Sequence, residues 1–106
     1  MAFFQVRFKT PVAQQELQTL LTGAHSLQAT SLFARLSNVV ASGLVPGEFS
    51  ADIHPPSGTL LYVRREGQMT AVFEIVGNQF TPGSILRILA VDQTYASAMT
   101  KAKARC

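Results

Sequence analysis

Apolar and polar residues alternate over the first stretch of the chain, residues 3–9. The apolar positions are Phe4, Val6 and Phe8, and the polar positions between them are Gln5, Arg7 and Lys9. Successive side chains of a β-strand point to opposite faces. The pattern therefore predicts a half-buried strand with one basic face.

After this strand the apolar residues recur at the three- and four-residue intervals of helices. Thr10 suits a helix N-cap, Pro11 suits the first helical position and Gly23 suits the end. We expect Ser26 to cap a second helix, which Gly43 ends. The apolar positions of this second helix are Ala29, Leu32, Phe33, Leu36, Val39 and Val40. The short connection predicts an antiparallel helical hairpin.

Three apolar stretches in the second half of the chain predict strands. Residues 60–65 and 69–76 flank a Glu66-Gly67 turn and form an expected hairpin. The core face of its second strand is Met69, Ala71, Phe73 and Ile75. Residues 85–91 are almost all apolar, which is typical of a central strand covered on both faces. Residues 48–53 alternate weakly and are expected to add an edge strand.

We expect Asp92 to cap a final helix containing Tyr95, Ala98, Met99 and Ala102. The predicted fold class is therefore α+β, with residues 1–106 as a single domain. It has an N-terminal strand, a helical hairpin on a mostly antiparallel sheet of four or five strands, and a C-terminal helix. The first strand is expected to join that sheet beside the last one.

Composition adds a hint about partners. The chain has 106 residues, of which 47% are hydrophobic and 14% charged. A typical globular domain has about 25% charged residues. A surface so poor in charge is often covered by a partner or a second copy of the chain. The formal net charge of +3 is compatible with RNA, DNA or an acidic protein but is too small for a strong nucleic-acid signature.

The remaining chemistry is sparse. Cys106 is the only cysteine, so no internal disulfide forms, and a reducing, cytoplasmic location is expected. No apolar run approaches the about 18 residues that span a bilayer, so no membrane association is expected. His25 and His54 have no Cys, Asp or Glu partner at ligand spacing. We therefore expect neither a metal site nor a cofactor.

The order of elements, together with three stretches of sequence, resembles the RelE/ParE family of small bacterial toxins. The stretches are FQVRFKTPVAQQELQTL, LYVRREGQMTAVFEIV and ILRILAVDQTYASAMTKA. They are similar to the family's opening strand and helix, its central hairpin, and its last strand and tail. The resemblance implies a toxin that acts on translation by cleaving mRNA on the ribosome, or on DNA gyrase. It also implies an antitoxin protein as partner.

The resemblance also implies site residues. RNA-cleaving members use cations and aromatic side chains on the sheet face, which stabilise charge as a ribose hydroxyl attacks phosphate. Arg64 and Arg65 match the family's basic pair. The arginine expected on the next strand is replaced by Thr70, so the candidate catalytic set is Arg64, Arg65, Arg87 and Tyr95. The candidate nucleic-acid-binding set is Arg64, Arg65, Lys101, Lys103 and Arg105.

Each of these groups also has a structural interpretation. Adjacent strand residues face opposite ways, so Arg64 and Arg65 cannot both line one site. Arg87 lies within an apolar strand, where pairing with Glu74 across the sheet is favoured over catalysis. The three basic residues at the chain end are expected to form a frayed, solvated tail. The alternative function is thus a non-enzymatic protein-binding module of the same fold, without toxicity. This alternative includes a homodimer as one of its forms.

Overall fold

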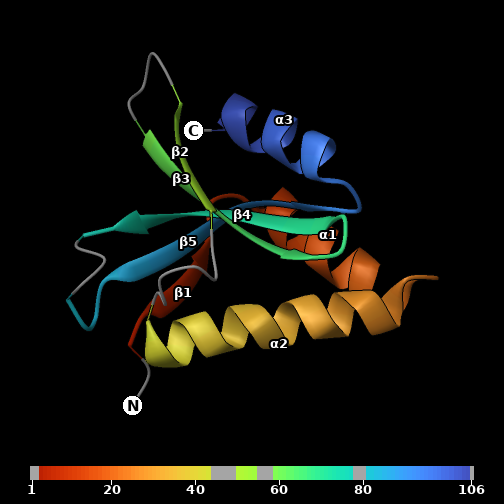
Figure 1. The fold of residues 1–106 in the computed structure, drawn as a ribbon, viewed down its shortest axis with the longest axis horizontal. Coiled ribbons are helices and arrows are strands. Elements are labelled where there is room, and N and C mark those ends of the chain that lie inside the picture. Colours follow the sequence, from red (N-terminus) through yellow and green to blue (C-terminus); the bar gives the residue numbers. More distant parts are fainter. Residues whose placement is uncertain (1–2, 44–49, 55–58, 78–80, 106) are drawn as a thin grey trace.

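The computed structural model describes residues 3–43, 50–54, 59–77 and 81–105, and the side chains of residues 50–54 and of Thr59 are not described. Three helices and five strands follow in an α+β order (Figure 1). The elements are β1 Gln5–Phe8, α1 Pro11–Thr22, α2 Ser26–Ser42, β2 Ser50–His54, β3 Thr59–Glu66, β4 Met69–Val76, β5 Ile85–Asp92 and α3 Tyr95–Arg105.

The five strands form one sheet in the order β1-β5-β4-β3-β2. β1 runs parallel to β5, and every other pair is antiparallel. The predicted place of the first strand, beside the last one, is confirmed. The expected strand at residues 48–53 is present as β2 over Ser50–His54, at the edge next to β3. Residues 48 and 49 lie outside the described part of the chain.

Helices cover both faces of the sheet (Figure 1). The predicted helical hairpin, α1 and α2, packs on one face, and α3 packs on the other. Leu32 and Leu36 of α2 meet Tyr62 and Phe73 in the larger core cluster. The smaller cluster under α3 contains Leu61, Val63, Val72, Leu89, Ala90, Ala98, Met99 and Ala102. Small residues on α3 let this helix lie close to the strands, because they occupy little space.

The almost unbroken apolar run of β5, which is covered on both faces, contains an irregularity. The pairing register with β4 shifts between Val72 and Phe73, which pair with Ala90 and Ile88 and leave Leu89 unpaired. A bulge of this kind inserts one extra residue into a strand. Leu89 and Ala90 consequently both belong to the cluster under α3, while Ile88 belongs to the cluster under the hairpin.

Turns and caps depart from the predictions by one or two residues. Glu66 is still paired, with Met69, so the β3–β4 turn consists of Gly67 and Gln68 rather than Glu66-Gly67. Gly67 has a φ of 62°, which glycine adopts at little cost. The N-cap of α2 is His25, without a side-chain cap hydrogen bond, and Ser26 is the first helical residue.

The two remaining caps give one confirmation and one correction. Thr10 caps α1 as predicted, because its hydroxyl accepts a hydrogen bond from the Ala13 amide at 3.4 Å. Asp92 does not cap α3, since it is the last residue of β5. Thr94 takes that role, and its hydroxyl accepts from the Ser97 amide at 3.2 Å. The Asp92 carboxylate is engaged by Lys101 instead.

The core cluster under the hairpin should be sensitive to truncation at Phe73. This side chain is fully buried, and its ring stacks on Tyr62 with centroids 5.6 Å apart. We predict that Phe73→Ala lowers the free energy of unfolding by about 3–5 kcal/mol, through lost burial and a residual cavity. Urea denaturation measures this. Leu27→Ala, at a position that is 87% exposed, is the matched control and should change it by less than about 0.5 kcal/mol.

Candidate functional site

The two arginines expected to bind RNA lie on opposite faces of the sheet. Tyr62 packs in the hairpin-side cluster, and alternation along β3 places Arg64 on that same face. Arg65 faces α3, where its guanidinium carbon lies 4.9 Å from the ring centre of Tyr95. The two residues thus serve different surfaces, as strand geometry predicts.

Arg87 pairs with a carboxylate across the sheet, as predicted. Its Nε donates to Glu74 Oε1 at 2.6 Å, and the two residues are register partners on β5 and β4. Lys9 Nζ approaches the same Glu74 oxygen at 3.8 Å. Arg7 lies level with Arg87 on the parallel strand β1. One carboxylate therefore serves two cations at this corner of the sheet, and a third cation is beside them.

The basic residues of α3 are not a frayed tail, so that expectation is wrong. Lys101 Nζ lies 2.9 Å from Asp92 and 3.1 Å from Glu16. Arg105 Nη1 donates to Glu16 at 2.8 Å and to the Leu89 carbonyl at 2.9 Å. The Arg105 side chain is only 19% exposed. These contacts hold the last helical turns of α3 against β5 and α1, and among the three residues only Lys103 is exposed.

This ion-pair network shifts the ionisation of its members. Burial raises the pKa of the Glu16 carboxyl, but hydrogen bonds from Arg105, Lys101 and the Val91 amide outweigh burial and hold it below its usual value. The hydrogen bond to Asp92 is the main reason why the pKa of Lys101 is raised. Both shifts favour the charged forms of Glu16 and Lys101 at neutral pH.

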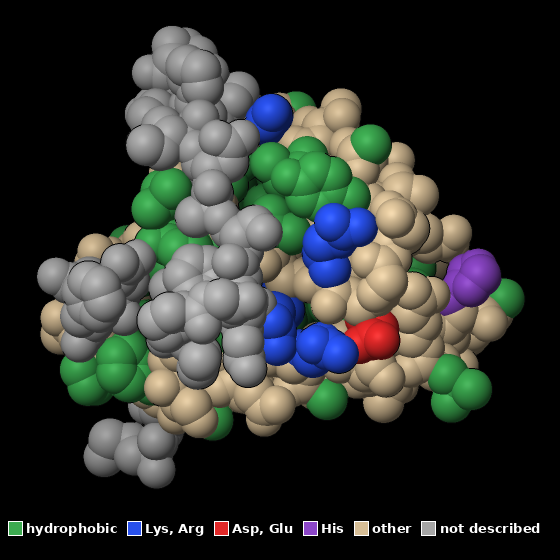
Figure 2. Space-filling view, viewed as in Figure 1, with side chains coloured by type: hydrophobic (Ala, Val, Ile, Leu, Met, Phe, Trp, Pro, Cys, Tyr) green, Lys and Arg blue, Asp and Glu red, His purple; other side chains and the backbone are tan. Residues whose placement is uncertain are grey.

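A second ion pair ties α2 to the β3–β4 turn. Arg35 Nε donates to Glu66 Oε2, and Gln28 Nε2 donates to the Glu66 carbonyl oxygen at 2.6 Å. Figure 2 shows Lys and Arg side chains beside an acidic side chain on the face that it views. Basic groups on this surface are thus partly neutralised within the chain.

The structure does not bring the candidate catalytic residues together. Arg65 and Tyr95 are in contact, Arg64 lies on the other face, and Arg87 is bound by Glu74. Of the candidate nucleic-acid-binding residues, Lys101 and Arg105 are held by Glu16. Within the described residues, no group of three or more His, Cys, Asp and Glu side chains could hold a metal ion.

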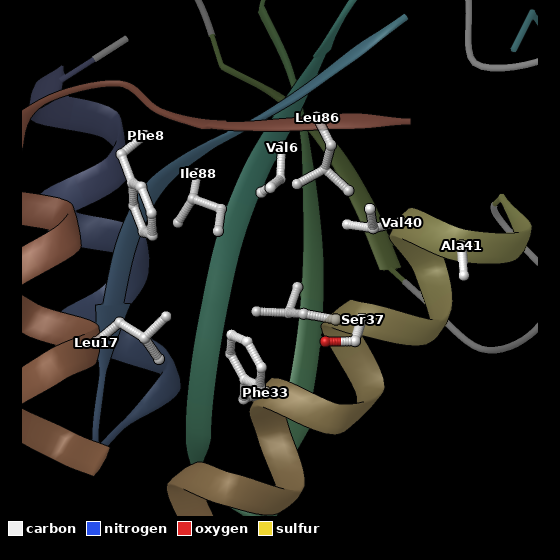
Figure 3. Close-up of a pocket in the computed structure, with 10 residues that line it drawn as sticks. Val6, Phe8, Leu17, Phe33, Ser37, Val40, Ala41, Leu86 and Ile88 are labelled. Carbon is white, nitrogen blue, oxygen red and sulfur yellow. The ribbon is translucent and has the colours of Figure 1, made fainter. Parts of the chain in front are cut away.

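The described residues form an apolar groove that the sequence patterns did not predict (Figure 3). Its volume is about 210 Å³. We define the groove by its lining residues, which are Val6, Phe8, Leu17, Phe33, Leu36, Ser37, Val40, Ala41, Leu86 and Ile88. Figure 3 shows Leu17 of α1 and Phe33 of α2 approaching the space beneath Val6, Leu86 and Ile88 of the sheet.

Two groove residues are large apolar side chains with high exposure. Phe33 is 47% exposed and Val6 is 41% exposed. Phe33 was predicted as core, but the buried stripe of α2 is Ala29, Leu32, Leu36 and Val39. Phe33 lies beside that stripe, about 100° around the helix from Leu32. The sequence carries no signal of this exposure, because Phe33 is four residues from Ala29 and three from Leu36, which is the spacing of a core position.

Comparison with known proteins gives no relative. No family model, no curated protein and no solved structure matches this chain. In the part of the chain that the structure describes, no helix is long and apolar enough to cross a membrane.

The Glu16 network predicts a specific pH dependence of stability. The pKa of Glu16 is lower in the folded state than in the unfolded state, where it is near 4.5. The ionised carboxyl therefore adds to the free energy of unfolding above pH 4.5, and this contribution is lost as the pH falls through the folded-state pKa. Glu16→Gln should lower the free energy of unfolding by about 1–2 kcal/mol at neutral pH, because Arg105 and Lys101 lose a charged partner. The difference in unfolding free energy between the variant and the wild type should shrink as the pH falls below 4.5 and through the lowered pKa of Glu16. Denaturant titrations at several pH values measure this, and a gap that is constant with pH would contradict it.

Proposed function

We propose that this protein is a non-enzymatic protein-binding module and that the apolar groove is its binding surface. The observation that carries the proposal is the exposure of Phe33 and Val6 at the mouth of a groove lined almost entirely by apolar side chains. Apolar surface that is concave and open to water marks binding sites on folded domains. Its burial by a partner is favourable by about 25 cal/mol per Å².

The size and lining of the groove favour a protein ligand over a cofactor. Small-molecule sites have volumes of about 300–1,000 Å³ and contain a few convergent polar groups. This groove has about 210 Å³ and has Ser37 as the polar side chain in its lining. It has room for one or two apolar side chains of a partner. It offers little that could orient a reacting group.

The paired carboxylates also favour binding over catalysis. Glu74 is engaged by Arg87 and Lys9, and Glu16 is engaged by Arg105 and Lys101. A general acid or base needs a pKa tuned towards neutrality and access to a substrate. The lowered pKa of Glu16 moves it away from that range. These ion pairs stabilise the fold, and the lining of the groove contains no charged side chain.

Substitution at Phe33 tests the binding proposal. We expect a displayed random peptide library, selected on the wild-type protein, to yield ligands rich in apolar residues. Phe33→Asp should weaken their binding at least about tenfold, because a charge at the groove mouth resists desolvation. Leu27→Asp is the matched control, since it places the same charge at an exposed apolar position of α2 outside the groove lining. Equal loss in both variants, or no loss in either, would contradict the proposal.

A toxin of a toxin-antitoxin pair is the second candidate function, and one contact favours it. Arg65 and Tyr95 are both exposed and are stacked at 4.9 Å, which presents a cation and an aromatic ring side by side. Such pairs bind single-stranded RNA by charge and stacking. The element order, which resembles that of RelE/ParE toxins, adds support. In that case an antitoxin would cover the groove.

Induction in bacteria separates the two candidates. The toxin proposal expects growth arrest when the chain is expressed without a partner, and relief of that arrest by Arg65→Ala or Tyr95→Ala. Lys103→Ala, which removes an exposed cation elsewhere on α3, is the control and should leave arrest unchanged. Message cleavage and gyrase supercoiling assays then identify the target. Normal growth with folded protein in the cells would contradict the toxin proposal and leave the binding module as the remaining candidate.

A further inference from the structure

We propose that the groove takes an extended segment of a different protein, with alternating apolar and acidic residues, which adds as a strand to the outer edge of β1. The inference rests on the proposed binding function and names the partner that the site fits. The apolar side chains of the added segment would enter the groove, and its acidic side chains would meet Arg7 on the opposite face of β1. Backbone, shape and charge each support this assignment.

Among the described residues, no strand pairs with the outer side of β1. β1 ends the five-strand order, with β5 as its neighbour. The amides of Gln5 and Lys9 donate to the Ser84 and Ile88 carbonyls, at 3.0 and 2.8 Å, and so point towards β5. Backbone groups alternate in direction along a strand. Those of Val6 therefore point away from the sheet, towards an incoming strand.

The side chain of Arg7 is hydrogen-bonded to one of these outward-pointing backbone groups. Its Nη1 donates to the Val6 carbonyl at 2.7 Å, in the place where a neighbouring strand's amide would donate. Edge strands are commonly protected by charged residues in this way. The contact is exposed and is made by a flexible side chain, so an incoming strand could displace it. Arg7 would then be released to meet an acidic side chain of that strand.

The side chains of β1 divide as the proposed segment requires. Val6 and Phe8 face the groove, while Gln5 and Arg7 lie on the opposite face. A strand added beside β1 places its own alternate side chains on these same two faces. One set lies at the groove mouth with Phe33 and Val40, and the other lies beside Arg7.

The charge around Arg7 favours acidic residues among the partner side chains that lie beside it. Arg7 is level with Arg87, and like charges directly opposite on neighbouring strands are destabilising. Glu74 is the carboxylate that engages this corner, and it already pairs with Arg87 and Lys9. The hydrogen bonds of the Arg7 side chain in the described part of the chain go to Val6 and Gln5. Carboxylates on an added strand would offset this excess of positive charge. A second copy of β1 would instead bring another cation, its own Arg7.

Capped, labelled hexapeptides test the inference by fluorescence anisotropy. We expect a peptide of alternating valine and glutamate to bind the full chain and its valine–lysine counterpart to bind at least tenfold more weakly. Arg7→Glu should weaken binding of the glutamate peptide at least tenfold, while Lys103→Glu, an equal charge change on α3, should leave it unchanged. Circular dichroism of each variant confirms that it is folded.

Backbone methylation of the peptide tests strand addition directly. Methylating one alternate set of its amides should abolish binding, and methylating the other set should not, because alternate amides point towards β1. If neither set matters, or if a helical peptide of the same composition binds more tightly, strand addition is wrong. If a single-stranded oligonucleotide displaces the peptide, the basic face serves nucleic acid and the inference is wrong.

Failure of this inference is distinguishable from failure of the proposed function. If hexapeptides do not bind but library ligands still depend on Phe33, the groove binds protein in another form and only the extended acidic partner is ruled out. If hexapeptides do not bind and no library ligand depends on Phe33, both are wrong.

Discussion

Burial of β5 on both faces is the constraint on which the rest of the structure depends. Its apolar side chains need a helical layer on each side, and the hairpin and α3 supply these layers. The bulge at Leu89 fits this arrangement, because it turns two successive residues towards α3. The bulge also frees the Leu89 carbonyl, to which Arg105 donates. The position of α3 thus follows from the geometry of β5, an interior strand of the sheet.

A shortage of carboxylates determines which partners the basic side chains of the surface have. The described acidic residues are Glu16, Glu66, Glu74 and Asp92, and each is paired with at least one cation. Two of them, Glu16 and Glu74, each engage two cations. The chain has nine Lys and Arg residues against six Asp and Glu residues. Some basic side chains therefore have neutral hydrogen-bond acceptors as partners in place of carboxylates. Arg7 is such a group, because its hydrogen bonds within the described residues go to a carbonyl and an amide oxygen.

Much of the fold could be predicted from the sequence because periodicity reports burial directly. The buried stripe Ala29, Leu32, Leu36 and Val39 of α2 and the continuous run of β5 correspond to their observed environments. The alternation in β1 does not, because Val6 is exposed and Phe8 is only half-buried. Asp92 and Arg105 show where this approach fails. Both were interpreted from local rules, as a helix cap and a solvated tail. Their actual partners, Lys101 and Glu16, are set by how α3 folds back over the sheet. No local pattern contains that information.

The groove was missed for a related reason. Phe33 satisfies the spacing of a core residue, and its partial exposure follows only from how far α2 and α1 cover β1 and β5. A layer of two helices over five strands leaves some strand surface uncovered, and here the uncovered surface adjoins the short edge strand β1. An apolar hollow beside an open strand edge combines two sources of affinity, side-chain burial and backbone pairing. Their juxtaposition favours an extended partner over a compact one.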